Sequence, residues 1–403
     1  MNIVIVGGGV SGVISAISIA HNSNFKVLIL ERNDKLLKKL LLTGNGRCNY
    51  FNEDRSIRNY HSKNMNLVSN FINDYNLDRV LRFYDDIGIV PKIKNGYYYP
   101  YSNQASSVYD CLISELDSLG VDVKYNYLVN DIKRDKDKFI INDSIVCDKL
   151  ILSTGSCAYP KTGSDGMGYE FLRSLGHNII EPCPALVQLV SDNKYCSMVS
   201  GVRSDAVLSL YEDDEFIASE EGEVQLTDYG VSGICTFNLS HYASRGLIEG
   251  KNEVIKVNFI PFIKEDYMEW FYNFSCAHRT KNIFELLSGF MNKKVINMIL
   301  KYNDIKKDDF YYELSFDKKR KFIKSLTEFS YNIIGTKGFS FGQICNGGVD
   351  LECINMKSCE SKIIPNLYIT GELLDINGNC GGYNLMMCVI SGLLVGDDII
   401  DKS

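Results

Sequence analysis

The N-terminal segment up to Glu31 constrains the fold more than any other part of the chain. A β-branched apolar run (Ile3–Val6) leads into a glycine-rich turn (Gly7–Gly12), which is followed by a run of small helical residues (Val13–Ala20) and a second apolar run (Lys26–Leu30). Glu31 comes directly after this second run. Strand, glycine turn, helix, strand and acid, in this order and spacing, predict a βαβ unit that binds a dinucleotide.

Physical chemistry explains why glycines and an acidic residue stand at these positions of the unit. Gly7 permits the tight turn, Gly9 lets the backbone approach a pyrophosphate, and Gly12 lets the helix pack closely on the strand. The helix N-terminus holds the phosphate charge. Glu31 can accept hydrogen bonds from both hydroxyls of an adenosine ribose and would repel a 2′-phosphate. The unit therefore predicts FAD or NAD, and by itself it does not distinguish between them.

The rest of the chain is of mixed α/β type. Further strands are expected at Val121–Tyr125, Phe139–Ile141, Lys149–Leu152, Ala206–Tyr211, Val254–Phe259 and Leu367–Thr370. Because a strand and a final helix from about Tyr383 return at the C-terminus, both chain ends are expected to build one domain. We predict a discontinuous nucleotide-binding domain of residues 1–185 and 335–403, a β-rich insertion of residues 186–262, and a helical cap of residues 263–334.

A second glycine cluster favours FAD. The late strand ends in Gly371 and Glu372, and Gly381-Gly382-Tyr383-Asn384 opens the last helix. A second strand-to-helix turn with bare backbone N–H groups is a second anion site. Such a helix N-terminus can stabilise the negative charge at the pyrimidine edge of a reduced flavin, whereas an NAD dehydrogenase has no such requirement. The dinucleotide is therefore predicted to be FAD.

Five separated motifs extend over almost the whole chain. They are Gly7-x-Gly9-x-x-Gly12, the run from Lys39 to Asn49 (K-L-L-L-T-G-N-G-R-C-N), Thr154-Gly155 with Tyr159–Tyr169, Thr227–Gly233, and Gly371–Asp375 with Gly381–Asn384. Together they resemble the YhiN/BaiN-like flavoproteins, a family also called aminoacetone-oxidase-like FAD enzymes. The sequence departs from the family pattern at Asn45, where Gly is usual, and at Cys380, where Thr is common.

The resemblance implies an α/β fold with a Rossmann-like, two-dinucleotide-binding-type FAD domain, interrupted by a small β-barrel-like domain and a helical cap. It implies no second Rossmann unit for a nicotinamide, so NADH or NADPH would be a transient electron donor. The predicted cofactor-binding residues are Gly7, Gly9, Val10, Ser11, Gly12, Glu31, Arg32, Lys39, Gly44, Gly46, Arg47, Asn49, Val129, Thr154, Gly155, Gly371, Glu372, Asp375, Gly382, Tyr383 and Asn384. Asp375 could instead cap its loop, and Tyr383 and Asn384 could contact substrate.

Arg47 and Cys48 are the candidate catalytic residues. Arg47 could stabilise an anionic flavin or bind a substrate anion, or it could pair with an FAD phosphate. Cys48 is a thiol in a glycine-rich loop, and a thiol beside reduced flavin can protonate a carbon while hydride arrives from N5. The alternative for Cys48 is a buried packing role. The tyrosine run Tyr97–Tyr101 is expected to be an edge strand or packing feature rather than a base-stacking platform.

The cysteines and the apolar runs exclude other classes of protein. The 13 cysteines are odd in number and lack C-x-x-C spacing, so neither a metal site nor a disulfide framework is expected. Val10–Ala20 and Cys388–Gly396 are shorter than the roughly 18 apolar residues of a membrane span. No signal-peptide pattern follows Met1, so the expected location is the cytoplasm.

The charge is unevenly distributed. The net charge is −7, yet the run from Arg279 to Lys324 carries twelve Lys and Arg against six Asp and Glu. This run is either a solvated helical face or a surface for phosphates, such as those of ribosomal RNA.

Three functions are compatible with these features. The first is an NAD(P)H-dependent reductase that passes hydride from FAD to a conjugated C=C, for which the resemblance implies dihydrouridine formation on ribosomal RNA. The second, also implied by the resemblance, is an oxidase of small amines. The third is a flavin-bearing binding protein without catalysis.

Overall fold

The computed structural model describes the whole chain, residues 1–403, and divides it into two compact units. Unit 1 consists of Met1–Pro184 and Gln343–Ser403, and unit 2 consists of Ala185–Gly342. Each unit has its own hydrophobic core.

Unit 1 is built on a seven-stranded sheet in the order β20-β21-β22-β11-β1-β2-β7. The five strands from β22 to β7 are parallel, and β20 and β21 add an antiparallel edge. The bounds of the sheet strands are β1 Asn2–Val6, β2 Lys26–Leu30, β7 Asp122–Lys124, β11 Lys149–Leu152, β20 Ile354–Asn355, β21 Glu360–Ser361 and β22 Leu367–Ile369. Because β22 comes from the C-terminal part of the chain and pairs with β11, both chain ends complete one sheet, as predicted.

Smaller sheets and helices surround this sheet. The remaining strands of unit 1 are β3 Phe51–Asn52, β4 Tyr60–His61, β5 Pro91–Lys94, β6 Tyr97–Pro100, β8 Ile132–Asp135, β9 Lys138–Ile141, β10 Ile145–Cys147, β12 Ile179–Ala185, β19 Ile344–Val349 and β23 Asn377–Gly378. Its helices are α1 Val10–His21, α2 Met65–Phe71, α3 Asp74–Asp86, α4 Ala105–Ser118, α5 Met167–Ser174 and α12 Tyr383–Asp401. The tyrosine-rich strand β6 is the middle strand of the sheet β3-β6-β5, so the expectation of an edge position was wrong.

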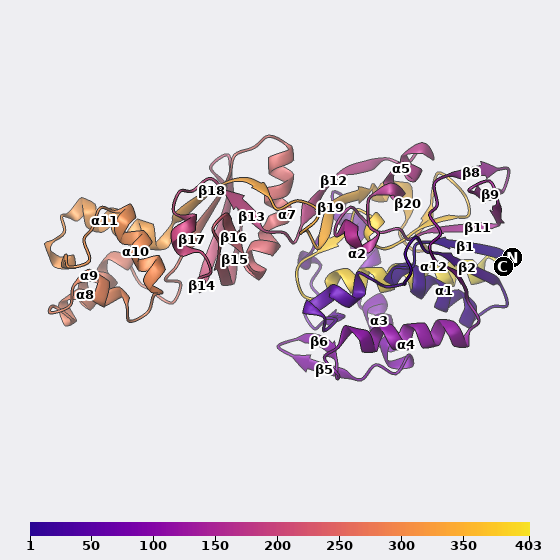
Figure 1. The fold of residues 1–403 in the computed structure, drawn as a ribbon, viewed down its shortest axis with the longest axis horizontal. Coiled ribbons are helices and arrows are strands. Elements are labelled where there is room, and N and C mark those ends of the chain that lie inside the picture. Colours follow the sequence, from indigo (N-terminus) through magenta and orange to yellow (C-terminus); the bar gives the residue numbers. More distant parts are fainter. The chain divides into compact units, whose positions relative to one another are not determined.

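Helices α1 and α12 pack against each other beside the main sheet (Figure 1). Two glycines of α12 make this close approach possible: a Cβ on Gly392 would lie 2.9 Å from the Ser11 carbonyl oxygen, and one on Gly396 would lie 2.0 Å from Ser18 Oγ. By length and composition α12 would suffice to cross a membrane, but 72% of its apolar window is buried inside the protein. Its hydrophobicity is therefore that of a core helix.

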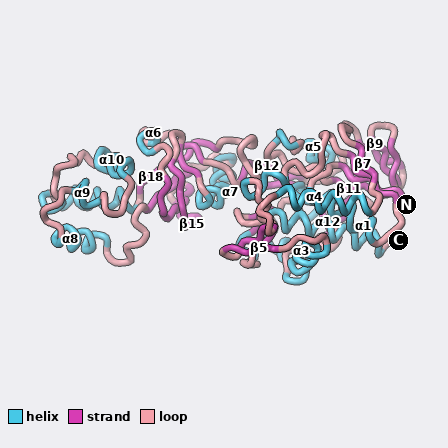
Figure 2. Tube along the Cα trace, turned by 60° about the horizontal axis from the view of Figure 1, so that its bottom comes forward, coloured by secondary structure: helices cyan, strands magenta, loops and turns pink.

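Unit 2 contains a closed six-stranded barrel in the order β13-β16-β15-β14-β17-β18. Its strands are β13 Leu189–Ser191, β14 Arg203–Glu212, β15 Glu215–Leu226, β16 Gly230–Ser232, β17 Glu253–Asn258 and β18 Phe329–Thr336. Its helices are α6 Cys196–Val199, α7 Ile234–Ile248, α8 Tyr267–Ala277, α9 Ile283–Leu287, α10 Lys293–Tyr302 and α11 Phe316–Thr327. Within unit 2, helices α8 to α10 gather at one end of the barrel (Figure 2).

Two details of unit 2 differ from the sequence analysis. The segment expected to be β-rich contains the 15-residue helix α7, which packs on strands β14 to β18. The boundary predicted at residue 334 falls inside β18, whose buried residues alternate with exposed ones as in a half-buried strand. No glycine or proline separates α11 from β18, and the transition therefore left no turn signal in the sequence.

Candidate functional site

The candidate site lies where four parallel strands of unit 1 end. Strands β1, β2, β11 and β22 run in the same direction, so the loops that follow them meet at one edge of the sheet. In open α/β sheets, ligands bind in the crevice outside the carboxyl ends of the strands.

The three motif glycines have different reasons to be glycine. Gly7 has φ of +103°, and a Cβ there would lie 2.4 Å from the Ser153 carbonyl oxygen. A Cβ on Gly12 would lie 2.2 Å from the Gly7 carbonyl oxygen. Gly9 has an ordinary φ of −76°, and its Cβ would meet nothing closer than 3.9 Å. Chain packing therefore requires Gly7 and Gly12, whereas the space beside Gly9 fits a ligand that approaches the backbone.

Helix α1 begins at this open space without a partner for its first N–H groups. Its N-cap is Gly9, no side chain caps it, and the first turn has no acidic residue. Val10 and Ser11, which the sequence assigns to cofactor binding, lie in this first turn, where helix N–H groups can bind a phosphate. The Ser11 hydroxyl itself accepts a hydrogen bond from Thr370 Oγ1 (3.1 Å), so the backbone of this turn, rather than that side chain, is the part free for an anion.

Glu31 is buried at the end of β2, with 6% of its surface exposed. Its Oε2 accepts a hydrogen bond from the Gly8 N–H (2.8 Å), and its Oε1 accepts from Asn33 N–H (2.8 Å) and Asn33 Nδ2 (2.7 Å). These bonds fix the carboxylate beside the glycine turn. Each carboxylate oxygen offers two lone pairs, so Oε2 retains the capacity to accept from a ribose hydroxyl.

Arg32 and Val129 lie around the same strand end. Arg32 forms an ion pair with Asp165 in the loop that follows β11, so its guanidinium has a partner within the chain. The Tyr127 N–H donates to the Glu31 carbonyl (2.9 Å), which brings the segment of Val129 next to β2. Val129 is buried.

Lys39 and Glu372, which are 333 positions apart, form an ion pair at 2.7 Å. The same oxygen of Glu372 accepts a hydrogen bond from Ser156 Oγ (2.7 Å), and the Glu372 carbonyl accepts from Tyr169 OH (3.1 Å). Ser156 was not predicted from the sequence, because a single serine after a Thr-Gly pair has no distinctive pattern. The loops after β11 and β22 are thus joined through one carboxylate.

Thr154 supplies an unpartnered polar atom at this edge. Its Oγ1 is buried and has no hydrogen-bond partner in the chain, and a Cβ on Gly168 would lie 2.0 Å from it. Gly155 follows with φ of +75°. Buried hydroxyls nearly always have a partner, so an orphaned one at the carboxyl end of β11 fits a bound group. The open space at Gly9, the uncapped helix and Thr154 together fit FAD.

The residues around the start of α12 mostly hold the chain together. Asp375 is almost completely buried, and its Oδ2 accepts from Ser62 Oγ (3.0 Å) and the Lys63 N–H (2.8 Å). Asn384 uses both amide atoms on the backbone of Gly378, at 2.8 Å each. Asn384 therefore shapes the turn before α12. Asp375 makes the contacts of a residue that caps a loop, which was the alternative to cofactor binding.

Two neighbouring residues complete this helix start. Gly382 is the N-cap of α12, with φ of +98° and no side-chain cap. The buried Tyr383 packs edge-on against Tyr60 at 5.5 Å. The first turn of α12, which has no side-chain cap, is the place where the glycine cluster predicts a second anion site.

His61 is a further polar residue near the start of α12, and it was not among the site residues predicted from the sequence. It lies on β4, which pairs with β23, and its Nε2 is 3.0 Å from Asn379 Oδ1. Burial lowers the pKa of His61, which keeps the ring neutral at physiological pH. Only the pairing of two very short strands brings this residue near the start of α12, and two-residue strands have no periodicity to detect.

The loop with the two catalytic candidates turns sharply. Gly44, Asn45 and Gly46 all have positive φ, so Asn45 adopts the left-handed conformation that Asn tolerates better than most residues. Arg47 is exposed, and its guanidinium lies 5.1 Å from the centre of the Tyr99 ring. In the amide orientation that satisfies its neighbours, Asn49 donates to the carbonyls of Phe51 and Tyr98.

Cys48 points into the core, in contrast to Arg47. It is fully buried, and burial raises the pKa of its thiol to about 12. The thiol is therefore protonated at neutral pH and has the surroundings of a packing residue.

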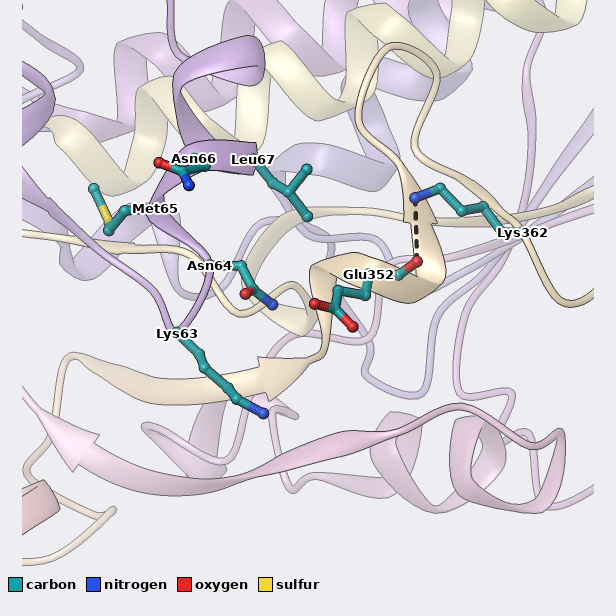
Figure 3. Close-up of a pocket in the computed structure, with 7 residues that line it drawn as sticks. All are labelled: Lys63, Asn64, Met65, Asn66, Leu67, Glu352 and Lys362. Atoms are coloured by element: carbon teal, nitrogen blue, oxygen red, sulfur yellow. Dashed lines mark hydrogen bonds between the residues drawn. The ribbon is translucent and has the colours of Figure 1, made fainter.

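A separate pocket of about 550 Å³ opens at the start of α2. Its lining residues are Lys63, Asn64, Met65, Asn66, Leu67, Glu352 and Lys362, and Lys362 Nζ donates to the Glu352 carbonyl at 3.1 Å (Figure 3). None of the predicted site residues lines it. Its one link to the site is the Lys63 backbone N–H, which donates to Asp375.

Comparison with known proteins gives matches over nearly the whole chain. Residues 1–398 match the family described as "HI0933-like protein Rossmann domain". The 3-dehydro-bile acid delta(4,6)-reductase of Clostridium scindens is 35% identical over 399 residues, covering 97% of each chain. The ribosomal RNA dihydrouridine synthase of Escherichia coli is 23% identical over 406 residues, covering 98% of this chain and 97% of the other. A flavocytochrome c3 fumarate reductase structure has a TM-score of 0.49 at 13% identity, covering 99% of this chain and 78% of that one.

Proposed function

The chain belongs to the HI0933-like Rossmann-domain family of FAD-dependent oxidoreductases, and from this premise we propose that it reduces a carbon–carbon double bond conjugated to a carbonyl group, with NAD(P)H as the electron donor. The observation that carries the proposal is the chemistry shared by two relatives. Both match over nearly the full length, and one is named as a delta(4,6)-reductase and the other as a dihydrouridine synthase. Each name denotes the saturation of a C=C bond.

The residues of unit 1 provide what such a reaction needs. When bound, FAD supplies hydride chemistry that no side chain has. Gly9 and the first turn of α1 would hold the pyrophosphate, and Glu31 would hold the adenosine ribose. The contacts of Glu372 with Lys39 and Ser156 fix the loops after β2, β11 and β22 to one another, so that the cofactor would meet a preformed edge.

Two further groups are suited to the substrate side of the reaction. The exposed Arg47 is placed to bind an anionic or carbonyl group. The N–H groups at the start of α12 are placed to stabilise negative charge.

For the substrate, we propose uridine in ribosomal RNA, and the charge of unit 2 supports this. Eleven of the twelve basic residues from Arg279 to Lys324 are exposed, and Lys319 is half-buried over the Tyr311 ring. The exposed aromatic residues Tyr312 and Phe316 lie in the same segment. Cations interleaved with exposed rings suit phosphates and unstacked bases.

The second candidate substrate is a small apolar enone. It is supported by the 35% identity to a bile acid reductase, which exceeds the identity to the RNA enzymes. The same flavin site serves both substrates, and only the recognition surface differs.

Nucleoside mass spectrometry of ribosomal RNA, from cells with and without the gene, tests the proposal. We expect dihydrouridine to disappear on deletion and to return with the wild-type gene. The double variant Lys318→Glu and Lys321→Glu should restore it poorly, while the matched variant Lys92→Glu and Lys94→Glu, on the exposed strand β5 of unit 1, should restore it fully. An unchanged RNA profile on deletion would contradict the RNA substrate.

Purified holoprotein distinguishes the remaining possibilities. Reduced flavin that is reoxidised by a conjugated steroid enone under nitrogen would support the small-molecule substrate. Peroxide release with a small amine would support the oxidase interpretation. A flavin that responds to neither NAD(P)H nor an amine would contradict any catalytic role.

A further inference from the structure

The pocket at the start of α2 has two walls, which come from segments that are far apart in the chain (Figure 3). Residues 63–67 form one wall, and Glu352 and Lys362 form the other. The volume of about 550 Å³ lies within the range of small-molecule sites, which is roughly 300–1,000 Å³. The proposed reaction uses none of these side chains, so the pocket is left without a role.

The buried Asp350 joins the two walls. Its Oδ1 accepts a hydrogen bond from Asn64 Nδ2 of one wall (2.9 Å) and from the Glu352 N–H of the other (3.0 Å). Within the second wall, the Lys362 N–H donates to the Cys353 carbonyl (2.8 Å), and Lys362 Nζ donates to the Glu352 carbonyl (3.1 Å). Both walls are therefore fixed before a ligand arrives.

The charged groups of the walls do not neutralise one another. The Glu352 carboxylate has no hydrogen bond or ion pair within the chain, and Lys362 Nζ contacts only a carbonyl oxygen. Lys63 Nζ is 3.8 Å from Asp350 Oδ2, which accepts a closer hydrogen bond from Asn178 Nδ2 (2.9 Å), and 62% of the Lys63 side chain is exposed. Two cations and one anion are therefore available to a ligand.

The first wall also has an apolar part. Met65 and Leu67 are half-buried, and both line the pocket. The sulfur of a methionine makes favourable contacts with aromatic rings. The pocket thus offers a place for a flat ring as well as for charges.

A ribonucleotide matches all three kinds of group. Its phosphates can pair with Lys63 and Lys362. The two hydroxyls of its ribose can donate to the Glu352 carboxylate, and its base can pack on Met65 and Leu67. An inorganic anion, in contrast, would leave the carboxylate and the apolar part without a partner.

The pocket borders the cofactor edge. The Lys63 N–H and Ser62 Oγ both donate to Asp375 Oδ2, at 2.8 and 3.0 Å. Asp375 lies in the segment between β22 and α12, whose first turn is the predicted second anion site. A ligand bound to the Lys63 side chain is therefore held by a residue that also contacts this segment.

We propose that this pocket binds a ribonucleotide while FAD occupies its own site. Free ribonucleotides such as ADP contain the ribose and phosphates that the pocket matches, and so does NADH. For NADH the inference rests on the proposed function, in which a nicotinamide dinucleotide supplies the electrons. For a free nucleotide it is independent of that function.

Isothermal titration calorimetry of FAD-saturated holoprotein with ADP tests the site. Saturation with FAD fills the other place where adenosine could bind. We expect one ADP site, and the double variant Lys63→Glu and Lys362→Glu should weaken binding by about tenfold or more. The matched variant Lys92→Glu and Lys94→Glu, with the same charge change on β5, should keep the wild-type Kd. No binding of ADP, or one Kd for all three proteins, would overturn the proposal.

Ligands that lack one part of ADP test the role of each wall. We expect 2′-deoxy-ADP to bind wild-type protein about threefold more weakly than ADP, and this difference should vanish in Glu352→Ala. Inorganic pyrophosphate should bind about tenfold more weakly than ADP. Pyrophosphate that binds as tightly as ADP would show a simple anion site and would overturn the nucleotide assignment.

Anaerobic stopped-flow reduction of the flavin by NADH separates the two sources. If NADH uses the pocket, ADP inhibits flavin reduction competitively, and the Lys63 and Lys362 variant needs more NADH for the same limiting rate. Reduction that is unaffected by bound ADP would assign the pocket to a free nucleotide and exclude NADH from it. A flavin that NADH does not reduce would contradict the proposed function, whereas the ADP titration would still decide the pocket.

Discussion

The two units expose opposite kinds of surface. At the sheet edge of unit 1, glycines without side chains allow backbone segments to approach each other, and they leave one open space beside Gly9. The helical segment of unit 2 instead exposes long lysine and arginine side chains, with exposed aromatic rings among them. A cofactor held for many turnovers needs shape, whereas a large polyanion is held by charge that acts over a distance. The comparison predicts that small changes of volume damage unit 1, while changes of charge damage unit 2.

The two units can be followed separately in one sample. The single tryptophan, Trp270, lies in α8 of unit 2 and stacks on Phe274 with ring centres 4.7 Å apart. Flavin fluorescence reports on unit 1. The two signals together show which unit a substitution affects.

The largest effect is expected from one methyl group at Gly9. Gly9→Ala should weaken FAD binding at least tenfold, about 1.4 kcal/mol or more, because its Cβ would occupy the space reserved for the pyrophosphate. The Trp270 unfolding transition should not change. Gly335→Ala in β18 of unit 2 is the matched control, since a Cβ there meets nothing within 4 Å. Full FAD affinity in the Gly9 variant would contradict the position of the cofactor.

A smaller loss of FAD affinity is expected from Glu31→Ala. The variant removes the ribose acceptor and frees the Gly8 N–H, so we expect FAD content after purification to fall severalfold. Arg173→Ala is its control, because the exposed ion pair of Arg173 with Glu181 lies outside the predicted cofactor residues and should contribute less than about 1 kcal/mol. Unchanged FAD content in the Glu31 variant would refute the ribose assignment.

The stability of unit 2 should depend on pH through Glu253. Burial, together with Glu212 directly opposite on the neighbouring strand, raises the pKa of Glu253 to about 8. The folded state therefore holds a proton that the unfolded state releases near the usual carboxyl pKa of 4.5. The free energy of unfolding of unit 2 should fall as pH rises through this window, by on the order of 2 kcal/mol.

Urea unfolding followed by Trp270 fluorescence at pH 6 and pH 9 measures this fall. Glu253→Gln should flatten it, because an amide stays neutral at both values. A fall of the same size in the Gln variant would mean that another group carries the pH dependence.

The smallest effect on function is expected from Cys48→Ala. Since the thiol is fully buried, the substitution should lower the melting temperature of unit 1 by a few degrees through the small cavity it leaves. Flavin reduction by NAD(P)H and reoxidation by substrate should stay within twofold of wild type. A reoxidation slowed more than tenfold, with normal flavin reduction, would restore Cys48 as the proton donor.

The sequence allowed prediction of those parts of unit 1 that a short pattern encodes. The glycine turn, Glu31 and the split of one sheet between both chain ends follow from local spacing. The contacts of Lys39 with Glu372 and of Ser156 with Glu372 do not, because the partners lie hundreds of residues apart and neither residue has a distinctive neighbour.

Unit 2 shows the same limit in another form. Exposed and buried residues alternate along β18. Because no turn signal precedes this strand, the end of the helical segment could not be predicted from the sequence. The acidic pair Glu212 and Glu253 was likewise not predicted, because only the register of β14 with β17 places them opposite each other.

The pairing of β22 with β11 has a consequence for the order in which the protein can form. Residues of unit 2 are contiguous in the chain, so all of them are synthesised before β22 and α12. The main sheet of unit 1 lacks an interior strand until Leu367–Ile369 emerges, and α1 lacks the helix that covers it until α12 follows. The barrel can thus form before β22 and α12 are made. The cofactor edge of unit 1, in contrast, cannot form until β22 and α12 join β11 and α1.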